Sequence, residues 1–468
     1  MTATFAIVDA LVEGRVSHVL WRDGTVVHVG AGHGRQRVAA LAADAVVDAA
    51  GGELIPGLHD HHVHLAALAA ARASVPVGPP DVIDRHGFTE ALRQAAAGRP
   101  GWIRGFGYHE SVAGHLDADL LDRLAGGDVP IRVQHRSGQM WVLNTAAMAT
   151  TGVGALEHAG VERDAGGRPT GRLFGLDAWL RDRVARTPID IAAVGRELAG
   201  YGVTGVTDMT PSAAGDDLTA LAPAADPGFP VRVTITGGPD LPDDVLPAVP
   251  RGPVKILPTE HQAPDLDDLA ARIVAGHARG RPVAIHCVTR VGLVVALAAW
   301  RVAGVHPGDR IEHGAVIPPE LFGDIRDAGL LVVTQPNLVA ERGDEYLTDV
   351  EPADLPDLWR LRSLLDAGIA VAGGTDPPFG HPDPWRAIAA ASARRTRRGN
   401  LLGPGERVTA RRALDLFLGT ADHPTRLRRI ASGERTDLCL LDAPLDDMLE
   451  NPSSAAVRRT FGADLVRA

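Results

Sequence analysis

The chain has 468 residues, of which 45% are hydrophobic and 22% charged, and its net charge is −11. This composition is typical of a folded globular protein and excludes a disordered chain. The negative charge argues against nucleic acid or an anionic membrane as the main partner. The longest apolar run, residues 291–300, is shorter than the roughly 20 residues that a membrane-spanning helix requires.

Two further features indicate a cytoplasmic protein. The first residues lack the basic patch and apolar stretch of a secretory signal. The chain contains two cysteines, Cys287 and Cys439, which are too few for a disulfide scaffold. We therefore expect a protein of the reducing cytoplasm.

Short strands are expected at both ends of the chain. Runs rich in valine and other apolar residues carry the signal, and Asp23-Gly24 suits a hairpin turn. The runs lie at residues 5–12, 17–29, 45–49, 437–441 and 456–466. Because chain ends often lie close together, we expect residues 1–52 and 430–468 to form a small composite β-sandwich domain.

Between these ends, eight apolar strand-like runs alternate with helical stretches. The runs are residues 53–56, 202–208, 231–236, 253–257, 283–287, 310–313, 330–335 and 370–373. This alternation predicts an α/β fold, a (β/α)8 TIM barrel over residues 53–429. The gap after the first run is too long for one crossover. Residues 66–200 are therefore expected to form an insertion after barrel strand 1, near the barrel mouth, with strands of its own at 102–106 and 131–135.

Side chains that can bind metals follow several of the barrel runs. In barrel enzymes the catalytic groups lie at the carboxyl ends of the strands. His62 and His64 follow the first run, and their spacing directs both side chains to one side of an extended chain. The other residues at strand ends are Lys255, His286, His313 and Asp376. One His pair is a weak signal, but four histidines and an aspartate at strand ends favour a zinc-type metal site.

Lys255 is the only lysine in the chain, and all other Lys and Arg positions are arginine. A GC-rich genome explains the preference for arginine but not the one lysine that remains, unless it remains by chance. A buried lysine can lose its proton and react with carbonyls or CO₂, whereas arginine stays protonated. The alternative is a lysine that pairs with a carboxylate such as Asp208, which otherwise could support a metal-bound histidine.

Taken together, these motifs resemble those of the metal-dependent amidohydrolase superfamily. The nearest group is amidohydrolase family 3, which includes N-substituted formamide deformylases, and the resemblance covers nearly the whole chain. The matching segments are Pro-Gly-x-x-Asp-x-His-x-His at 56–64, Val-Lys-Ile at 254–256, Ala-Ile-His at 284–286, Ile-Glu-His at 311–313, Gly-Gly-Thr-Asp-Pro-Pro at 373–378, Asp383-Pro384 and the tail at 433–438.

The resemblance implies a hydrolase that cleaves a non-peptide C–N bond in an amide, formamide or cyclic amide. It implies two divalent metal ions, with zinc as the expected metal, and a metal-bridging hydroxide as nucleophile. His62, His64 and Asp376 would bind the more buried ion, and His286 and His313 the second. Lys255, carboxylated by CO₂, would bridge the two ions. Asp376 would be the general base.

The chain departs from the family pattern where a substrate would be touched. Thr289 and Arg290 replace a Gly-Asp pair after the fifth-strand histidine, and Gln139 replaces an insertion histidine. We expect substrate contacts from Arg290, which could receive a carboxylate, and from the insertion. For each of these residues, the alternative is a role in packing, at the surface or in a salt bridge, without substrate contact. The insertion candidates are His109, Glu110, His135 and Trp141.

Two other functions remain open. A mononuclear heterocycle deaminase on the same fold generally lacks the bridging lysine, so Lys255 argues against it. A non-catalytic scaffold would be expected to have lost ligands, and this chain has all of them. The expected partner is a small-molecule substrate, with neither nucleic acid nor membrane, and a homodimer is left open. Substrate, native metal and oligomeric state do not follow from the sequence.

Overall fold

The protein folds into two compact units. One combines Met1–Ala66 with Ile191–Ala468, and the other is Ala67–Asp190. Among the described residues, no helix is long and apolar enough to cross a membrane. The computed structural model describes residues 3–32, 42–98, 101–185, 188–211, 216–242, 246–258 and 265–462.

Eight parallel strands of the described residues form the centre of the first unit. They are β6 (Leu58–Val63), β13 (Val203–Asp208), β14 (Arg232–Ile235), β15 (Val254–Ile256), β16 (Val283–Cys287), β17 (Arg310–His313), β18 (Leu331–Thr334) and β19 (Ala370–Gly373). They pair in chain order as two sheets, β6 to β14 and β15 to β19. This is a TIM-barrel-like α/β arrangement.

Backbone hydrogen bonds span both gaps between the two sheets. At one gap, the Lys255 N–H donates to the Gly237 carbonyl over 2.9 Å. At the other, the Asp376 N–H donates to the His62 carbonyl over 2.8 Å. The pairing of the parallel strands is interrupted at these two places. Lys255 and Asp376, which lie there, were both expected to bind metal.

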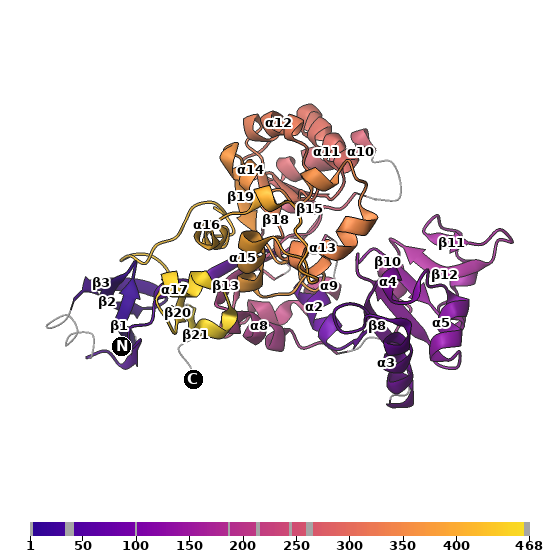
Figure 1. Cartoon of the computed structure of the whole chain (residues 1–468), viewed down its shortest axis with the longest axis horizontal. Helices are drawn as coiled ribbons and strands as arrows, with labels where there is room; N and C mark the ends of the chain where they lie inside the picture. Colours follow the sequence, from indigo (N-terminus) through magenta and orange to yellow (C-terminus); the bar gives the residue numbers. More distant parts are fainter. Residues whose placement is uncertain are drawn as a thin grey trace. The chain divides into compact units, whose positions relative to one another are not determined.

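Helices connect the strands of this unit and cover their outer side. Figure 1 shows α10, α11, α12 and α14 around β15, β18 and β19. The Thr289 hydroxyl caps α11 by accepting the Gly292 N–H, and the buried face of α11 includes Leu293 and Trp300. The helices are α2 (Leu65–Arg72), α8 (Ile191–Gly200), α9 (Asp216–Ala220), α10 (Leu266–Ala278), α11 (Arg290–Ala303), α12 (Phe322–Asp327), α13 (Asn337–Asp349), α14 (Arg362–Asp366), α15 (Pro384–Ala393), α16 (Ala410–Asp415) and α17 (Leu445–Glu450).

The first barrel strand differs from the expectation. Residues 53–56 were expected to begin the barrel, but β5 (Leu54–Pro56) pairs antiparallel with β20 (Leu438–Leu441). The barrel begins two residues after β5 ends, at Leu58 in β6, which pairs parallel with β13. The apolar pattern ends at Pro56 because β6 is rich in histidine, although all six of its residues are buried. Hydrophobicity alone therefore assigned the barrel strand to the wrong segment.

Strands from both ends of the chain share one hydrophobic cluster. Its buried members include Ile7, Trp21, Leu54, Leu440 and Phe461. The N-terminal sheet, in the order β3-β2-β1-β4, consists of β1 (Thr4–Val12), β2 (Arg15–Arg22), β3 (Thr25–Ala31) and β4 (Ala45–Asp48). The second sheet, β21-β20-β5, ends with β21 (Val457–Phe461); residues 463–466 of the strand expected at 456–466 lie outside the described residues. A separate sandwich domain remains a prediction.

The second unit has a six-stranded sheet with the order β11-β12-β10-β9-β8-β7. The insertion was expected to reach residue 200, but this unit ends at Asp190, and α8 belongs to the first unit. The strands expected near residues 102–106 and 131–135 are confirmed. The elements are β7 (Val75–Pro76), β8 (Ile103–Tyr108), β9 (Ile131–His135), β10 (Met140–Leu143), β11 (Val161–Arg163), β12 (Pro169–Phe174), α3 (Arg85–Gly98), α4 (Glu110–Ala113), α5 (Ala118–Ala125), α6 (Thr145–Thr151) and α7 (Asp177–Arg181).

The shared cluster predicts that a change near the C-terminus weakens a core built from both ends. Leu440 is fully buried there. We expect Leu440→Ala to lower the free energy of unfolding by about 2–5 kcal/mol, because it removes buried methyl groups and leaves a cavity. Urea unfolding followed by circular dichroism measures the change. The matched control is Leu401→Ala at an exposed leucine; equal stability of the two variants would contradict the shared core.

Candidate metal centre

The period of β6 separates its histidines into two sets. His62 and His64 share one side of the chain, and His59 and His61 share the other. The rings of His59 and His61 pack 4.4 Å apart, and His59 Nε2 lies 3.0 Å from the Thr207 hydroxyl. The His62 Nδ1–H donates to Oε2 of Glu312 over 2.5 Å. This bond leaves the Nε2 lone pair of His62 available as a metal ligand.

Asp376 completes a cluster with His62 and His64. Its Oδ1 lies 3.6 Å from His62 Nε2 and 3.4 Å from His64 Nε2. These distances suit a common ion, since ligand atoms at ~2.0–2.1 Å from a tetrahedral metal are about 3.3 Å apart. Asp376 has a φ of 58°, a conformation that is uncommon for residues other than glycine and is typical of functional sites.

The buried carboxyl of Asp60 ties β6 to the loop that carries Asp376. Its Oδ1 accepts the backbone N–H groups of His62 and Thr375, each over 3.1 Å, and its Oδ2 accepts the Thr375 hydroxyl. Burial raises the pKa of Asp60 to about 7, although the bonds from Thr375 and His62 lower it. Asp60 therefore fixes the backbone on both sides of the cluster.

His313 and His286 lie beside this cluster at the ends of β17 and β16. The His313 ring centre is 4.7 Å from that of His62 and 4.5 Å from that of His286. The His313 Nδ1–H donates to the amide oxygen of Gln335 over 2.8 Å, which again leaves Nε2 as the free lone pair. Burial, followed by nearby positive charges, holds the pKa of His62 and of His313 well below the usual range. The lowered pKa values favour neutral rings, which is the form in which an imidazole can bind a metal.

Lys255 is buried in β15, and its amine has no hydrogen-bond partner among the described residues. Burial lowers its pKa to about 8, against the opposing charges of Glu312 and Asp376. The carboxylate of Asp208, expected as an alternative partner, instead accepts the N–H groups of Leu65 over 2.7 Å and Thr210 over 3.1 Å. Asp208 therefore holds the backbone that follows His64.

Three buried polar atoms of the centre lack hydrogen-bond partners in the described part of the chain: Lys255 Nζ, His62 Nε2 and Asp376 Oδ1. Such atoms are costly to bury unless something satisfies them. Neutral imidazoles and a carboxylate directed at one point are a donor set for a divalent metal. The residues present therefore fit a metal ion.

Comparison with known proteins agrees with this geometry. A sequence profile described as the amidohydrolase family matches residues 45–460. The chain belongs to the amidohydrolase family. A curated relative, the N-substituted formamide deformylase of Arthrobacter pascens, is 27% identical and covers 92% of this chain and 91% of its own. The protein is therefore a hydrolase that acts on carbon–nitrogen bonds.

Solved structures support the fold of this amidohydrolase. An uncharacterized metal-dependent hydrolase of Pyrococcus horikoshii OT3 is 16% identical with a TM-score of 0.73, over 98% of this chain and 100% of its own. Another, from Pyrococcus furiosus, is 20% identical with a TM-score of 0.69, over 94% and 99%. These likenesses extend over both units of the chain.

Glu312 supports the centre of this amidohydrolase, although it was not among the site residues expected from the sequence. Besides His62, this carboxylate accepts the Arg310 Nε–H over 2.5 Å, and Arg310 also donates to the His61 carbonyl over 3.0 Å. Both charged side chains are almost fully buried. The signal was present, because a glutamate inside a buried strand needs a partner for its charge.

Arg290 is held by acidic side chains. Its guanidinium lies 2.8 Å from Asp354, 2.7 Å from Asp357 and 3.3 Å from Glu320. These three ion pairs favour the salt-bridge role over reception of a substrate carboxylate. The departure from the family pattern at 289–290 is thus accounted for by a helix cap and an ion-pair network.

The substrate candidates of the insertion lie in the second unit. The Trp141 ring is buried there, its Nε1–H donates to Asp177 over 2.8 Å, and the guanidinium groups of Arg104 and Arg132 lie over it. This is a packing environment. His109 and His135, in contrast, lie close together on either side of Glu110.

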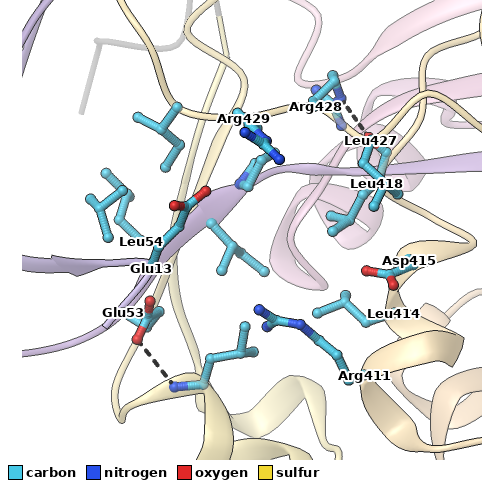
Figure 2. A pocket seen from close by; sticks show the side chains of 15 residues that line it. Glu13, Glu53, Leu54, Arg411, Leu414, Asp415, Leu418, Leu427, Arg428 and Arg429 are labelled. Carbon is cyan, nitrogen blue, oxygen red and sulfur yellow. Dashed lines mark hydrogen bonds between the residues drawn. The ribbon is translucent and has the colours of Figure 1, made fainter. Parts of the chain in front are cut away.

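A cavity of about 260 Å³ lies elsewhere in the amidohydrolase (Figure 2). Its lining includes Glu13, Glu53, Arg411 and Asp415, and none of the six expected metal ligands. Pro56, which also lines it, precedes the amino end of β6. Because barrel active sites lie at the opposite, carboxyl end of the strands, this cavity is not the candidate active site.

The contacts of Glu312 predict an effect on metal binding. We expect Glu312→Gln to weaken the affinity of the His62–His64–Asp376 cluster for zinc by about 10–100-fold, because an amide orients and polarises the His62 ring less well. Competition with a chromophoric chelator measures the affinity. Glu320→Gln, at a side chain that is 68% exposed, is the matched control. Unchanged affinity in Glu312→Gln would show that His62 does not depend on this carboxylate.

Proposed function

We propose that this amidohydrolase cleaves the C–N bond of a small N-substituted formamide or related amide at a centre of two divalent metal ions. The observation that carries the proposal is the buried amine of Lys255, without a hydrogen-bond partner among the described residues, in the same interior as the His62–His64–Asp376 cluster. The substrate class is inferred from the name of the Arthrobacter pascens relative.

Six residues would hold the two ions, with zinc as the expected metal. His62, His64 and Asp376 would bind one ion, and His286 and His313 the other. Lys255 would serve both as a carbamate, formed when its neutral amine adds to CO₂ and releases a proton. A pKa of about 8 leaves about a tenth of the amine neutral at pH 7. Bound ions supply polarisation of the substrate carbonyl and a lowered pKa for water.

Asp376 would move the proton that the reaction requires. Amide cleavage needs a base to accept a proton from the attacking water and an acid to protonate the leaving nitrogen. The Asp376 carboxylate faces His62 and His64 from the end of β19, and it can perform both steps in turn. Asp60, Glu312 and Gln335 would act by positioning, since each of them holds backbone or ring atoms of the centre.

A substrate panel tests the proposed reaction. N-substituted formamides, N-acyl amines, cyclic amides and aminated heterocycles are incubated with the zinc-loaded protein. Release of amine, formate and ammonia is then measured separately. We expect amine and formate from a formamide, in a reaction that a chelator abolishes. Ammonia from a heterocycle with no amide cleavage would overturn the proposal in favour of a deaminase, and inactivity on all classes would favour a scaffold.

The proposed base predicts the outcome of Asp376→Asn. We expect turnover to fall on the order of 10²–10⁴-fold, because an amide cannot accept the proton. The fold should be unchanged in circular dichroism. Asp366→Asn, at an exposed aspartate, is the control and should be fully active. A rate close to wild type in Asp376→Asn, at equal metal content, would assign the proton transfer to another group.

The proposed carbamate predicts different behaviour for two substitutions of Lys255. Arginine keeps a positive charge but cannot form a carbamate, and alanine leaves space for a small carboxylic acid. We expect both variants to lose activity and one of two metal equivalents in elemental analysis. Added formate or acetate should restore part of both to Lys255→Ala and neither to Lys255→Arg. Full activity of Lys255→Arg would exclude the bridging role.

A further inference from the structure

The second unit contains a cluster of metal-binding side chains that the proposed reaction does not use. It consists of His109, Glu110 and His135, each of which offers one donor atom, all within 4.8 Å of one another. Glu110 Oε2 lies 3.0 Å from His135 Nε2 and 3.9 Å from His109 Nε2. Donor atoms around a tetrahedral ion are about 3.3 Å apart, so a small movement of Glu110 would place the three at ligand spacing.

Two neighbouring parallel strands bring the histidines together. His109 directly follows β8, and His135 is the last residue of β9. The two strands pair in parallel, with Tyr108 opposite His135. Both rings therefore lie at the same edge of the sheet, and Glu110, next to His109, lies between them. The carboxyl edge of a parallel sheet is a common place for binding sites.

Both rings are oriented by the same local contact. Each histidine has a serine two residues further along the chain, in the sequence His-x-Ser. His109 Nδ1 lies 2.9 Å from the Ser111 hydroxyl and accepts the Ser111 N–H over 3.2 Å, and His135 Nδ1 has the same two contacts with Ser137, at 2.8 and 3.2 Å. These contacts direct both Nε2 atoms toward Glu110. A histidine that binds a metal through Nε2 carries its proton on Nδ1, so metal binding would replace the backbone N–H contact at each Nδ1 by an Nδ1–H bond to the serine hydroxyl.

The charge and exposure of the cluster suit a cation. Burial raises the pKa of Glu110, but the hydrogen bond and positive charge of His135 outweigh this and lower it to about 2, so the carboxylate is ionised. The side chains are 12%, 31% and 16% exposed for His109, Glu110 and His135. Solvent can therefore reach them, and two imidazoles with one carboxylate leave a fourth position for water.

We propose that His109, Glu110 and His135 bind one divalent transition-metal ion such as zinc. This site of the second unit is distinct from the candidate metal centre at the His62–His64–Asp376 cluster, called the barrel centre below. The proposal does not depend on the reaction proposed above, because no residue is shared between the two clusters. The alternative is a plain ion pair between His135 and Glu110, with no metal bound.

Metal counting on the full chain tests the site. The apoprotein is prepared with a chelator and dialysed against a fixed concentration of free zinc, and bound zinc per chain is measured by elemental analysis. We expect the double variant His109→Ala/His135→Ala to bind one equivalent less than the wild type. The matched control is His86→Ala, in the same unit, where the imidazole is 90% exposed beside Glu90. This control should keep the wild-type count.

A second variant, Glu110→Gln, tests the site even if the double variant does not fold. Glu110→Gln keeps the size of the side chain but removes the anionic donor, so we expect at least tenfold weaker zinc binding at this site alone. Cobalt provides an independent signal, since its visible absorption should lose one component in Glu110→Gln and keep the component of the barrel centre. Equal zinc counts and equal cobalt spectra in wild type, the double variant and Glu110→Gln would overturn the metal site and leave the ion pair.

Discussion

The candidate metal centre of the barrel depends on a buried chain of hydrogen-bonded side chains that runs from Arg310 through Glu312 to His62. It links β17 to β6, which are far apart in sequence, and its two contacts are both 2.5 Å long. Removing one member of such a chain leaves an uncompensated charge in the interior, which costs several kcal/mol. The chain also fixes which nitrogen of His62 carries the proton. The site is thus held by the same groups that join two strands of different sheets, β6 and β17.

Much of this centre could be predicted from sequence because parallel strands end at one edge. His62, His64 and Asp376 were expected to meet, and the structure brings them together. The supporting residues were harder to predict, since Gln335 and Glu312 act through ring nitrogens, and their partners are distant in sequence. The start of β6 was misplaced for a related reason: its buried histidines are stabilised by individual polar contacts, which an apolar pattern does not reveal. The pattern of α8 is that of a helix in either unit, so it does not determine where the second unit ends.

The two histidine clusters follow one design. In each, imidazoles lie at the carboxyl ends of parallel strands, an oxygen atom lies at Nδ1, and a carboxylate faces the Nε2 atoms; in the second unit Nδ1 also accepts a backbone N–H. They differ in burial, because His62 is inaccessible whereas His135 is 16% exposed. Burial lowers the dielectric constant around the barrel centre and strengthens its electrostatic interactions. The cluster of the second unit has no such environment, which suits binding rather than demanding chemistry.

The pairing of β5 with β20 has a consequence for biosynthesis. The Gly57 N–H donates to the Asp437 carbonyl over 2.7 Å, one residue before β6 begins. The segment leading into β6 is therefore anchored by residues that are synthesised 380 positions later (437 − 57). Domains generally fold from the N-terminus as synthesis proceeds. Here, the segment that precedes β6 can form its hydrogen bonds to β20 only after β20 has been synthesised. The histidines of β6 are made about 380 residues before the strand that anchors them.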